Sequence, residues 1–176
     1  MIERERKFLP DPASPELAKL LSHPSIERVV IEQGYVIATK SREELRIRHA
    51  DEYFYLTVKK GKGIQREEYE SRITEELFDL LWPATEGARI EKTRFRIPAD
   101  QFYLDEGLDA ARSEEERLVV EIDRFAGVHE GLFLIEVEFP TTESAERFEP
   151  PPWFGPEVSE DPRYTNSSLA RAQAVP

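Results

Sequence analysis

Eight stretches of the chain alternate between apolar and polar side chains with a period of two, and this alternation restricts the fold more than any other feature. In a β-strand, side chains two residues apart project from the same face, so each stretch predicts a strand. The chain is therefore expected to be α+β and mainly β, with a few short helices. The predicted strands cover residues 3–9, 29–39, 45–49, 54–60, 65–73, 91–97, 118–125 and 132–139.

Short helices are predicted where a capping residue precedes an apolar run. Ser14 and Pro15 open a predicted helix at 16–22, and Thr74 opens another at 75–82. Two further candidate helices have weaker patterns, at 143–148 and 167–174.

Two loops are predicted from composition. Lys60-Gly61-Lys62-Gly63 joins two strands and favours a hairpin turn over a phosphate loop, because a Walker sequence needs a longer glycine spacing and a following helix. The acidic stretch 105–116 favours a solvated loop or hairpin tip.

Sorting each strand by face separates a largely apolar set of side chains from an almost entirely charged set. A single open sheet, with helices on one face and water on the other, would explain this pattern. Its charges should then be mixed, whereas here each strand tends to present one sign. The charged set is Glu3, Glu5, Lys7, Arg46, Arg48, Lys59, Arg66, Glu68, Glu70, Lys92, Arg94, Arg96, Glu121, Asp123, Glu136 and Glu138.

So many strands can also close into a barrel, with the apolar face outside under the helices and the charged face lining a wet interior. Carboxylates in that interior could bind hard cations, and guanidinium and ammonium groups could hold phosphate oxygens. A metal on the acidic side and an anion on the basic side would relieve repulsion within each sign. The pattern thus predicts a site for a metal–polyphosphate complex.

Composition restricts the remaining classes of function. Thirty-six acidic and 24 basic residues give a net charge of −12, which disfavours binding to nucleic acid or to an anionic membrane. The chain has no cysteine, and no secretory or membrane-spanning apolar stretch is evident. We expect one domain, residues 1–176, in a soluble cytoplasmic protein that is a monomer or a homodimer.

Short motifs recur along nearly the whole chain. They are Glu3-x-Glu5-x-Lys7, Leu45-Arg46-Ile47-Arg48, Leu56-Thr57-Val58-Lys59, Arg66-x-Glu68-x-Glu70, Glu91-Lys92-Thr93-Arg94, Glu121-x-Asp123, Glu136-x-Glu138 and Asp161-x-Arg163-Tyr164-x-Asn166. Together these motifs resemble the CYTH superfamily and, within it, the short bacterial triphosphate tunnel metalloenzymes. The sequences 81–87 and 150–155 look especially like members described as inorganic triphosphatases.

This resemblance implies an eight-stranded antiparallel closed barrel, the triphosphate tunnel, with short helices packed outside it. It also implies Mg²⁺ or Mn²⁺ as cofactor and inorganic triphosphate as substrate. The implied metal ligands are Glu3, Glu5, Glu136 and Glu138. A further set of carboxylates would hold a second metal or position water, and it consists of Glu68, Glu70, Glu121 and Asp123, of which Glu121 and Asp123 are counted among the metal ligands. The implied substrate ligands are Lys7, Arg46, Arg48, Lys59, Lys92, Arg94, Arg96 and Arg163. Catalytic candidates are Glu3, Glu5, Lys7, Glu68 and Glu70, and no single general base is assigned among them.

The activity expected from the resemblance is metal-dependent hydrolysis of inorganic triphosphate to pyrophosphate and phosphate. One alternative is a nucleotide-directed enzyme of the same superfamily, either a class IV-like adenylate cyclase or a thiamine triphosphatase. Another is a noncatalytic polyphosphate-binding module. His23, His49 and His129 belong to no metal or triad motif, and Trp82 and Trp153 adjoin prolines, so these residues are expected to be structural.

Overall fold

The computed structural model describes residues 2–38, 43–60, 65–97 and 118–176, and it leaves the side chains of residues 2, 3, 38, 65 and 66 undescribed. The predicted turn at 61–63 and the predicted loop at 105–116 therefore lie outside the described residues. All eight predicted strands are confirmed. They are β1 (Ile2–Phe8), β2 (Glu27–Ala38), β3 (Glu44–Ala50), β4 (Tyr53–Lys60), β5 (Gln65–Ile73), β6 (Arg89–Ile97), β7 (Val119–Phe125) and β8 (Phe133–Glu138).

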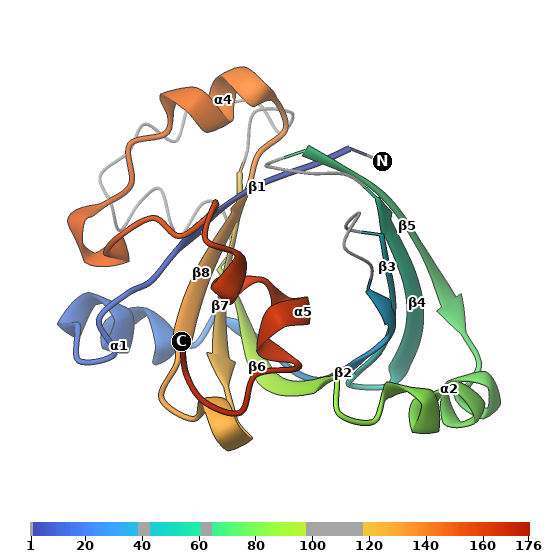
Figure 1. Ribbon diagram of the computed structural model, residues 1–176. Helices are drawn as coiled ribbons and strands as arrows, with labels where there is room; N and C mark the ends of the chain where they lie inside the picture. The colour runs from blue at the N-terminus through green and yellow to red at the C-terminus, as the bar shows by residue number, and fades with distance from the viewer. Residues whose placement is uncertain (1, 39–42, 61–64, 98–117) are drawn as a thin grey trace.

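The strands form a closed antiparallel barrel, as the family resemblance implied, and their order is β1-β5-β4-β3-β2-β6-β7-β8 (Figure 1). Strand β1 closes it by dividing its length between two partners. Residues 2–4 pair with β5, and residues 5–8 pair with β8. This register places Glu5 opposite Glu138 and Lys7 opposite Glu136.

The predicted caps open the observed helices. The side chain of Ser14 accepts from Leu17 N at the start of α1 (Pro15–Leu21), and Thr74 accepts from Leu77 N at the start of α2 (Glu75–Leu81). The other described helices are α4 (Thr142–Arg147), α5 (Asn166–Leu169) and the 3₁₀ turns η1 (Trp82–Thr85), η3 (Gly127–His129), η4 (Pro152–Phe154) and η5 (Pro162–Tyr164).

The predicted helix at 167–174 is wrong in its extent. The hydroxyl of Thr165 accepts from Ser168 N, so α5 begins one residue earlier, at Asn166. It ends at Leu169, and only turns and bends follow.

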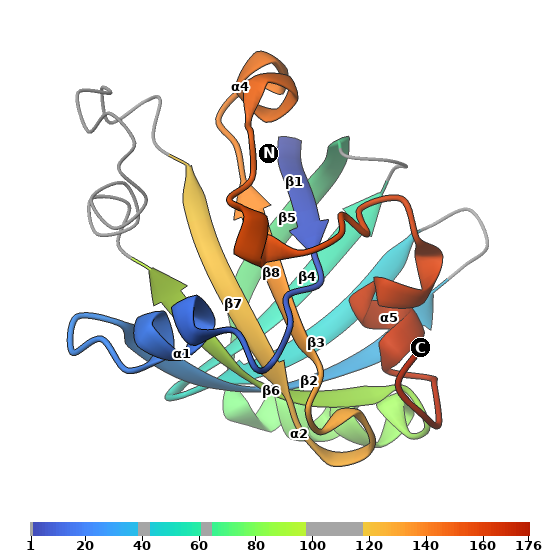
Figure 2. The ribbon, with the colours of Figure 1, turned by 90° about the vertical axis from the view of Figure 1, so that its left-hand side faces the viewer.

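The larger apolar core lies outside the barrel, between the strands and the helices. Outward side chains of β6, β7 and β8, including Phe95, Ile122 and Val137, pack there with Leu17 of α1 and Ala145 of α4. Figures 1 and 2 show α1 and α4 on this side of the barrel. The apolar outer face is therefore covered by helices on this side, as expected.

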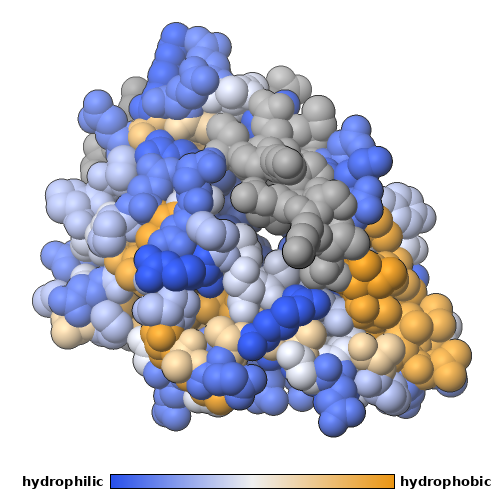
Figure 3. Space-filling view, viewed as in Figure 1, coloured by the Kyte–Doolittle hydropathy of each residue, from blue (hydrophilic) through white to orange (hydrophobic). Residues whose placement is uncertain are grey.

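The outer face of β4 and β5 is less covered. Val58 and Tyr69 lie opposite each other there and are 42% and 67% exposed. Figure 3 shows hydrophobic surface over this side of the molecule. A homodimer through this face stays a prediction.

A second apolar core lies inside the barrel at one end. Inward residues of β2, β6 and β8, namely Tyr35, Ile90 and Leu134, pack there with Tyr164 and Leu169 of the C-terminal segment. Both ribbon views place α5 across this end (Figures 1 and 2). The barrel interior is therefore charged along part of its length and apolar at the end that α5 covers.

The chain after α4 returns along β1 before it reaches α5. Gly155 passes so close to β1 that an added Cβ would lie 2.2 Å from the carbonyl oxygen of Leu9, and its φ of +71° also favours glycine. Arg6 then forms an ion pair with Glu157 at 2.6 Å. These contacts fix the path of the C-terminal segment.

No helix among the described residues is long and apolar enough to cross a membrane.

Candidate active site

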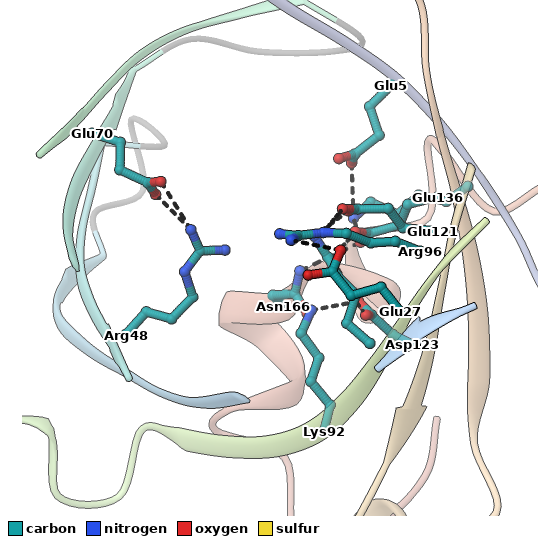
Figure 4. Close-up of polar contacts among 12 residues, drawn as sticks. Glu5, Glu27, Arg48, Glu70, Lys92, Arg96, Glu121, Asp123, Glu136 and Asn166 are labelled. Carbon is teal, nitrogen blue, oxygen red and sulfur yellow. Dashed lines mark hydrogen bonds and ion pairs between the residues drawn. The ribbon is translucent and has the colours of Figure 1, made fainter. Parts of the chain in front are cut away.

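A cavity of about 490 Å³ lies inside the barrel, and charged side chains from most of its strands line it. Figure 3 shows the hollow, and Figure 4 shows side chains that face each other across it. The charged side chains that the sequence placed on the inner face and that line this cavity are Glu5, Lys7, Arg46, Arg48, Lys59, Glu68, Glu70, Lys92, Arg94, Arg96, Glu121, Glu136 and Glu138.

One wall, formed by β1, β6, β7 and β8, carries a buried ionic network. Arg94 lies at its centre, where Nε contacts Asp123 at 2.7 Å and Nη2 contacts Glu136 at 2.5 Å. Its Nη1 also pairs with Glu121. Lys7 Nζ contacts Glu136 at 2.5 Å and Glu5 at 2.8 Å. We call Glu5, Lys7, Lys92, Arg94, Glu121, Asp123 and Glu136 the β6–β8 network.

The opposite wall, formed by β3, β4 and β5, carries a second network. Both Oε atoms of Glu70 accept from Arg48 at 2.9 Å, and the hydroxyl of Thr57 donates to the same carboxylate at 2.7 Å. Lys59 contacts Glu68 at 2.8 Å. We call Arg46, Arg48, Lys59, Glu68 and Glu70 the β3–β5 network. In Figure 4, Arg48 and Glu70 lie across the cavity from the β6–β8 network.

The structure does not separate an acidic side from a basic side, contrary to the sequence-based expectation. Each strand does tend to present one sign, but neighbouring strands bring opposite signs together. Lys7 lies opposite Glu136 between β1 and β8, and Lys59 lies opposite Glu68 between β4 and β5. Each network therefore pairs cations with carboxylates across the strands, and these pairs relieve much of the repulsion between like charges without any ligand.

The contacts within the β6–β8 network keep its buried groups ionised. Burial alone would lower the pKa of Lys7, but Glu136 and Glu5 raise it above its usual range. Burial alone would raise the pKa of Asp123, but Arg94 and Lys92 hold it below its usual value. Burial also opposes ionisation of Glu136, yet Lys7 and Arg94 hold its pKa well below the usual value.

The pKa of Lys92 is shifted in the opposite direction from that of Lys7. It is 3% exposed, and it donates to Asp123. Burial and the nearby charge of Arg94 outweigh the attraction of Asp123 and lower the pKa of Lys92 to about 8. Lys92 is therefore the cation of this network whose charge is most sensitive to mildly alkaline pH.

The structure brings most of the predicted site residues together, with three exceptions. Asp123 is fully buried behind Lys92 and Arg94, and it does not line the cavity. Arg163 is not brought to the cavity, because it turns back to Asp161 at 2.6 Å and its side chain is 64% exposed. Glu3 lies in β1, but its side chain is among those that the structure does not describe.

Sequence reasoning missed several residues that line the cavity. Gln33 and Tyr35 of β2 line the cavity, and Gln33 Nε2 donates to the hydroxyl of Tyr35 at 2.7 Å. Glu44, Thr165 and Asn166 also reach the cavity. The alternation within β2 could have identified Gln33 and Tyr35. No pattern of strand period could have identified the residues of α5.

The carboxylates of β1 and β8 fit a divalent metal in chemistry. Glu5, Glu136 and Glu138 line the cavity and offer only oxygen donors, which Mg²⁺ and Mn²⁺ prefer. No three metal-binding groups converge among the described side chains. Two of the carboxylates form ion pairs with Lys7 instead, so a metal would have to replace the ammonium group at their oxygens.

Comparisons with known proteins show the family of the chain and agree with its fold. The CYTH domain model matches residues 1–148. An inorganic triphosphatase from Nitrosomonas europaea is 38% identical over 172 residues, which are 97% of this chain and 97% of that protein. An inorganic triphosphatase from Acetivibrio thermocellus is 33% identical over 171 residues, which are 96% of this chain and 93% of that protein.

Solved structures also include an inorganic triphosphatase that is similar to this chain in sequence and fold. The crystal structure of an inorganic triphosphatase is 36% identical, with a TM-score of 0.62, and the match covers 98% of this chain and 96% of that one. A conserved hypothetical protein from Pyrococcus furiosus is 18% identical, with a TM-score of 0.54 and 82% coverage of both chains. The second likeness supports the fold alone.

Proposed function

The chain belongs to the CYTH domain family, and from this we propose that it is an enzyme that hydrolyses inorganic triphosphate to pyrophosphate and phosphate inside its barrel. The observation that carries this proposal is the cavity with both cationic side chains and carboxylates on each of its two walls. A linear triphosphate carries several negative charges along its length, and cations on both walls can hold it on two sides.

We infer that substrate and metal bind by exchanging partners with the two networks. Phosphate oxygens would take the place of carboxylates at Arg46, Arg48 and Lys59 on one wall. On the other wall, phosphate oxygens would replace carboxylates at Lys7, Lys92 and Arg94. The displaced carboxylates would then be available to a metal ion or to water, because the strands hold their backbones at the cavity wall.

Glu5, Glu136 and Glu138, with Glu3 and at a second site Glu121, are the residues that would hold Mg²⁺ or Mn²⁺. Such an ion supplies Lewis-acid neutralisation of phosphate oxygens when it is bound. The arginines and lysines would orient the triphosphate, so that a water molecule can attack its terminal phosphorus in line as the bond to the bridging oxygen breaks. Pyrophosphate leaves with that oxygen, and one proton of the water passes to a carboxylate or to solvent.

Glu68 and Glu70 remain candidates for orienting the water, as does Glu5. Glu70 already accepts from Thr57 and Arg48, so its carboxylate is held on the β3–β5 wall. No single general base is assigned. The mechanism relies mostly on positioning and charge neutralisation.

Phosphate release from several substrates tests this function. The purified protein is given triphosphate, pyrophosphate, ATP or thiamine triphosphate, each with Mg²⁺, with Mn²⁺ or with a chelator. We expect rapid release of orthophosphate from triphosphate with metal, and none with the chelator. Cyclic AMP and pyrophosphate from ATP would instead identify a cyclase, and tight triphosphate binding without turnover would identify a binding module.

The lowered pKa of Lys92 predicts a pH dependence for triphosphate binding in the presence of a chelator. A lysine with a pKa of about 8 is mostly charged at pH 7 and mostly neutral at pH 9, so it loses its attraction for phosphate in that interval. A Lys92→Arg variant keeps its charge throughout. The ratio of variant affinity to wild-type affinity should therefore rise about tenfold between pH 7 and pH 9.

Isothermal titration calorimetry at both pH values measures this ratio. Comparing the two proteins cancels the protonation of triphosphate itself, because that is the same for both. A ratio that stays constant between pH 7 and pH 9 would show that Lys92 does not change its charge in this range.

A further inference from the structure

The C-terminal segment reaches the cavity although it lies beyond the part of the chain that matches the family model. That match ends at residue 148, whereas Thr165 and Asn166 line the cavity. The barrel strands alone therefore do not complete the lining. Asn166 is the first residue of α5 and the only asparagine in the sequence.

Asn166 joins two members of the β6–β8 network that carry opposite charges. Its Oδ1 accepts from Lys92 Nζ at 3.2 Å, and its Nδ2 donates to Glu136 Oε1 at 3.4 Å. Figure 4 shows Asn166 between the strand that carries Lys92 and the carboxylates of the network. An amide offers one acceptor and two donors without net charge, so it can satisfy both neighbours at once.

The position of Asn166 is fixed from several sides. Leu169 is fully buried in the inner core, and its carbonyl oxygen lies 2.8 Å from Nε2 of the buried His129. The hydroxyl of Ser167 donates to Glu44 on β3. The short helix α5 is therefore held to η3 on one side and to β3 on another, and it presents the Asn166 amide at a set place in the cavity.

A neutral bridge matters because both neighbours have to change partners when substrate and metal bind. A carboxylate at position 166 would compete with phosphate for Lys92, and a cation there would compete with metal for Glu136. An amide holds both side chains in place, yet it competes only weakly with an ionic partner, since charge-assisted hydrogen bonds are stronger than those of neutral groups.

We propose that Asn166 is a positioning residue of the reaction, which holds Lys92 and Glu136 in the geometry that receives the terminal part of the triphosphate. The proposal rests on the proposed function. It assigns a role at the site to the C-terminal segment, and to a neutral side chain among the charged ones. The role is exerted through Lys92 and Glu136, which are the groups that touch substrate or metal.

Kinetics of an Asn166→Ala variant test the role. We expect kcat/KM for triphosphate to fall about tenfold, because two side chains lose the bond that fixes their geometry. The matched control is Gln173→Ala, which removes an exposed amide from the same segment and should leave kcat/KM unchanged. An Asn166→Asp variant should not recover the activity, because its charge lies beside Glu136. Activity of Asn166→Ala within twofold of wild type would overturn the proposal.

A spectroscopic measurement tests the contacts without turnover. Labelling with ¹⁵N-asparagine gives a single side-chain amide signal, since the chain has one asparagine. Lys92→Met and Glu136→Gln should each shift this signal in the absence of substrate, whereas the exposed Glu91→Gln on the outside of β6 should not. An unchanged signal in both inner variants would overturn the proposal. Because no substrate is present, this result stands apart from any failure of triphosphate hydrolysis.

Discussion

Replacing Arg94 with methionine is expected to lower the free energy of unfolding by about 3–5 kcal/mol, the usual cost of leaving buried charges without their partner. Asp123 is fully buried, and Glu136 is 5% exposed. Arg94 contacts both carboxylates, and it also pairs with Glu121. Lys7 and Lys92 remain in the variant, but together they cannot replace three ion pairs. Urea denaturation at pH 7 measures this loss.

Arg96 provides the matched control for this substitution. It lies two residues further along the same face of β6, and its side chain is 44% exposed, compared with 11% for Arg94. Its partners Glu27 and Glu121 lie at 3.4 Å and 3.2 Å. Exposed pairs contribute about 0–1 kcal/mol, so Arg96→Met should cost no more than that. Equal losses in the two variants would contradict the stabilising role assigned to Arg94.

The effect of Arg94→Met should also depend on pH. Wild-type Asp123 and Glu136 have lowered pKa values, so their stabilising effect is present above pH 4 to 5 and is lost as the pH falls through the folded-state values. Without Arg94, burial favours the protonated carboxyl groups, and the variant takes up protons at a higher pH than the wild type does. The stability gap between the two proteins should therefore narrow as the pH falls from 7 to 4.

Replacing Glu5 with glutamine is expected to reduce kcat/KM for triphosphate about a hundredfold or more, while the fold stays intact. The substitution removes one charged oxygen ligand from the proposed metal site on β1 and β8. It leaves Lys7 paired with Glu136, so no buried cation loses all its partners. Orthophosphate release, measured over a range of Mg²⁺ or Mn²⁺ concentrations, should also show that the variant needs more metal.

Glu91→Gln is the control for Glu5→Gln, because it makes the same chemical change on the outside of the barrel. Glu91 is exposed on β6, and it lines a small surface hollow rather than the inner cavity. The Glu91→Gln variant should hydrolyse triphosphate at the same rate as the wild type. A Glu5→Gln protein with turnover within threefold of wild type would remove Glu5 from the catalytic set.

Much of the fold could be predicted from the sequence because the signals are local. Period-two alternation located all eight strands, and the Ser14 and Thr74 caps located α1 and α2. The inner face of the barrel followed from the same alternation. The side chains predicted to face inward on β3 and β6, such as Arg46 and Lys92, do line the cavity. Their roles in binding and catalysis stay predictions.

Other parts of the site depend on contacts between segments that are distant in the sequence. The contacts of Asn166 with Lys92 and Glu136 span 74 and 30 residues. Arg163 looked like a ligand because it sits in a family motif, but Asp161, two residues away, takes up its guanidinium group. Asp161 and Arg163 lie two residues apart in the sequence, but only the structure shows that they pair with each other and that Arg163 does not line the cavity.

The sequence by itself determined which side chains share a face, because the geometry of a β-strand fixes the direction of every second residue. It thereby determined the strands and their charged face, and the motifs along the chain carried the family resemblance. Only the tertiary structure decided which charges meet, because the order and register of the strands set the partner of each side chain. That order brings opposite signs together across neighbouring strands, so each of the two networks contains both cations and carboxylates.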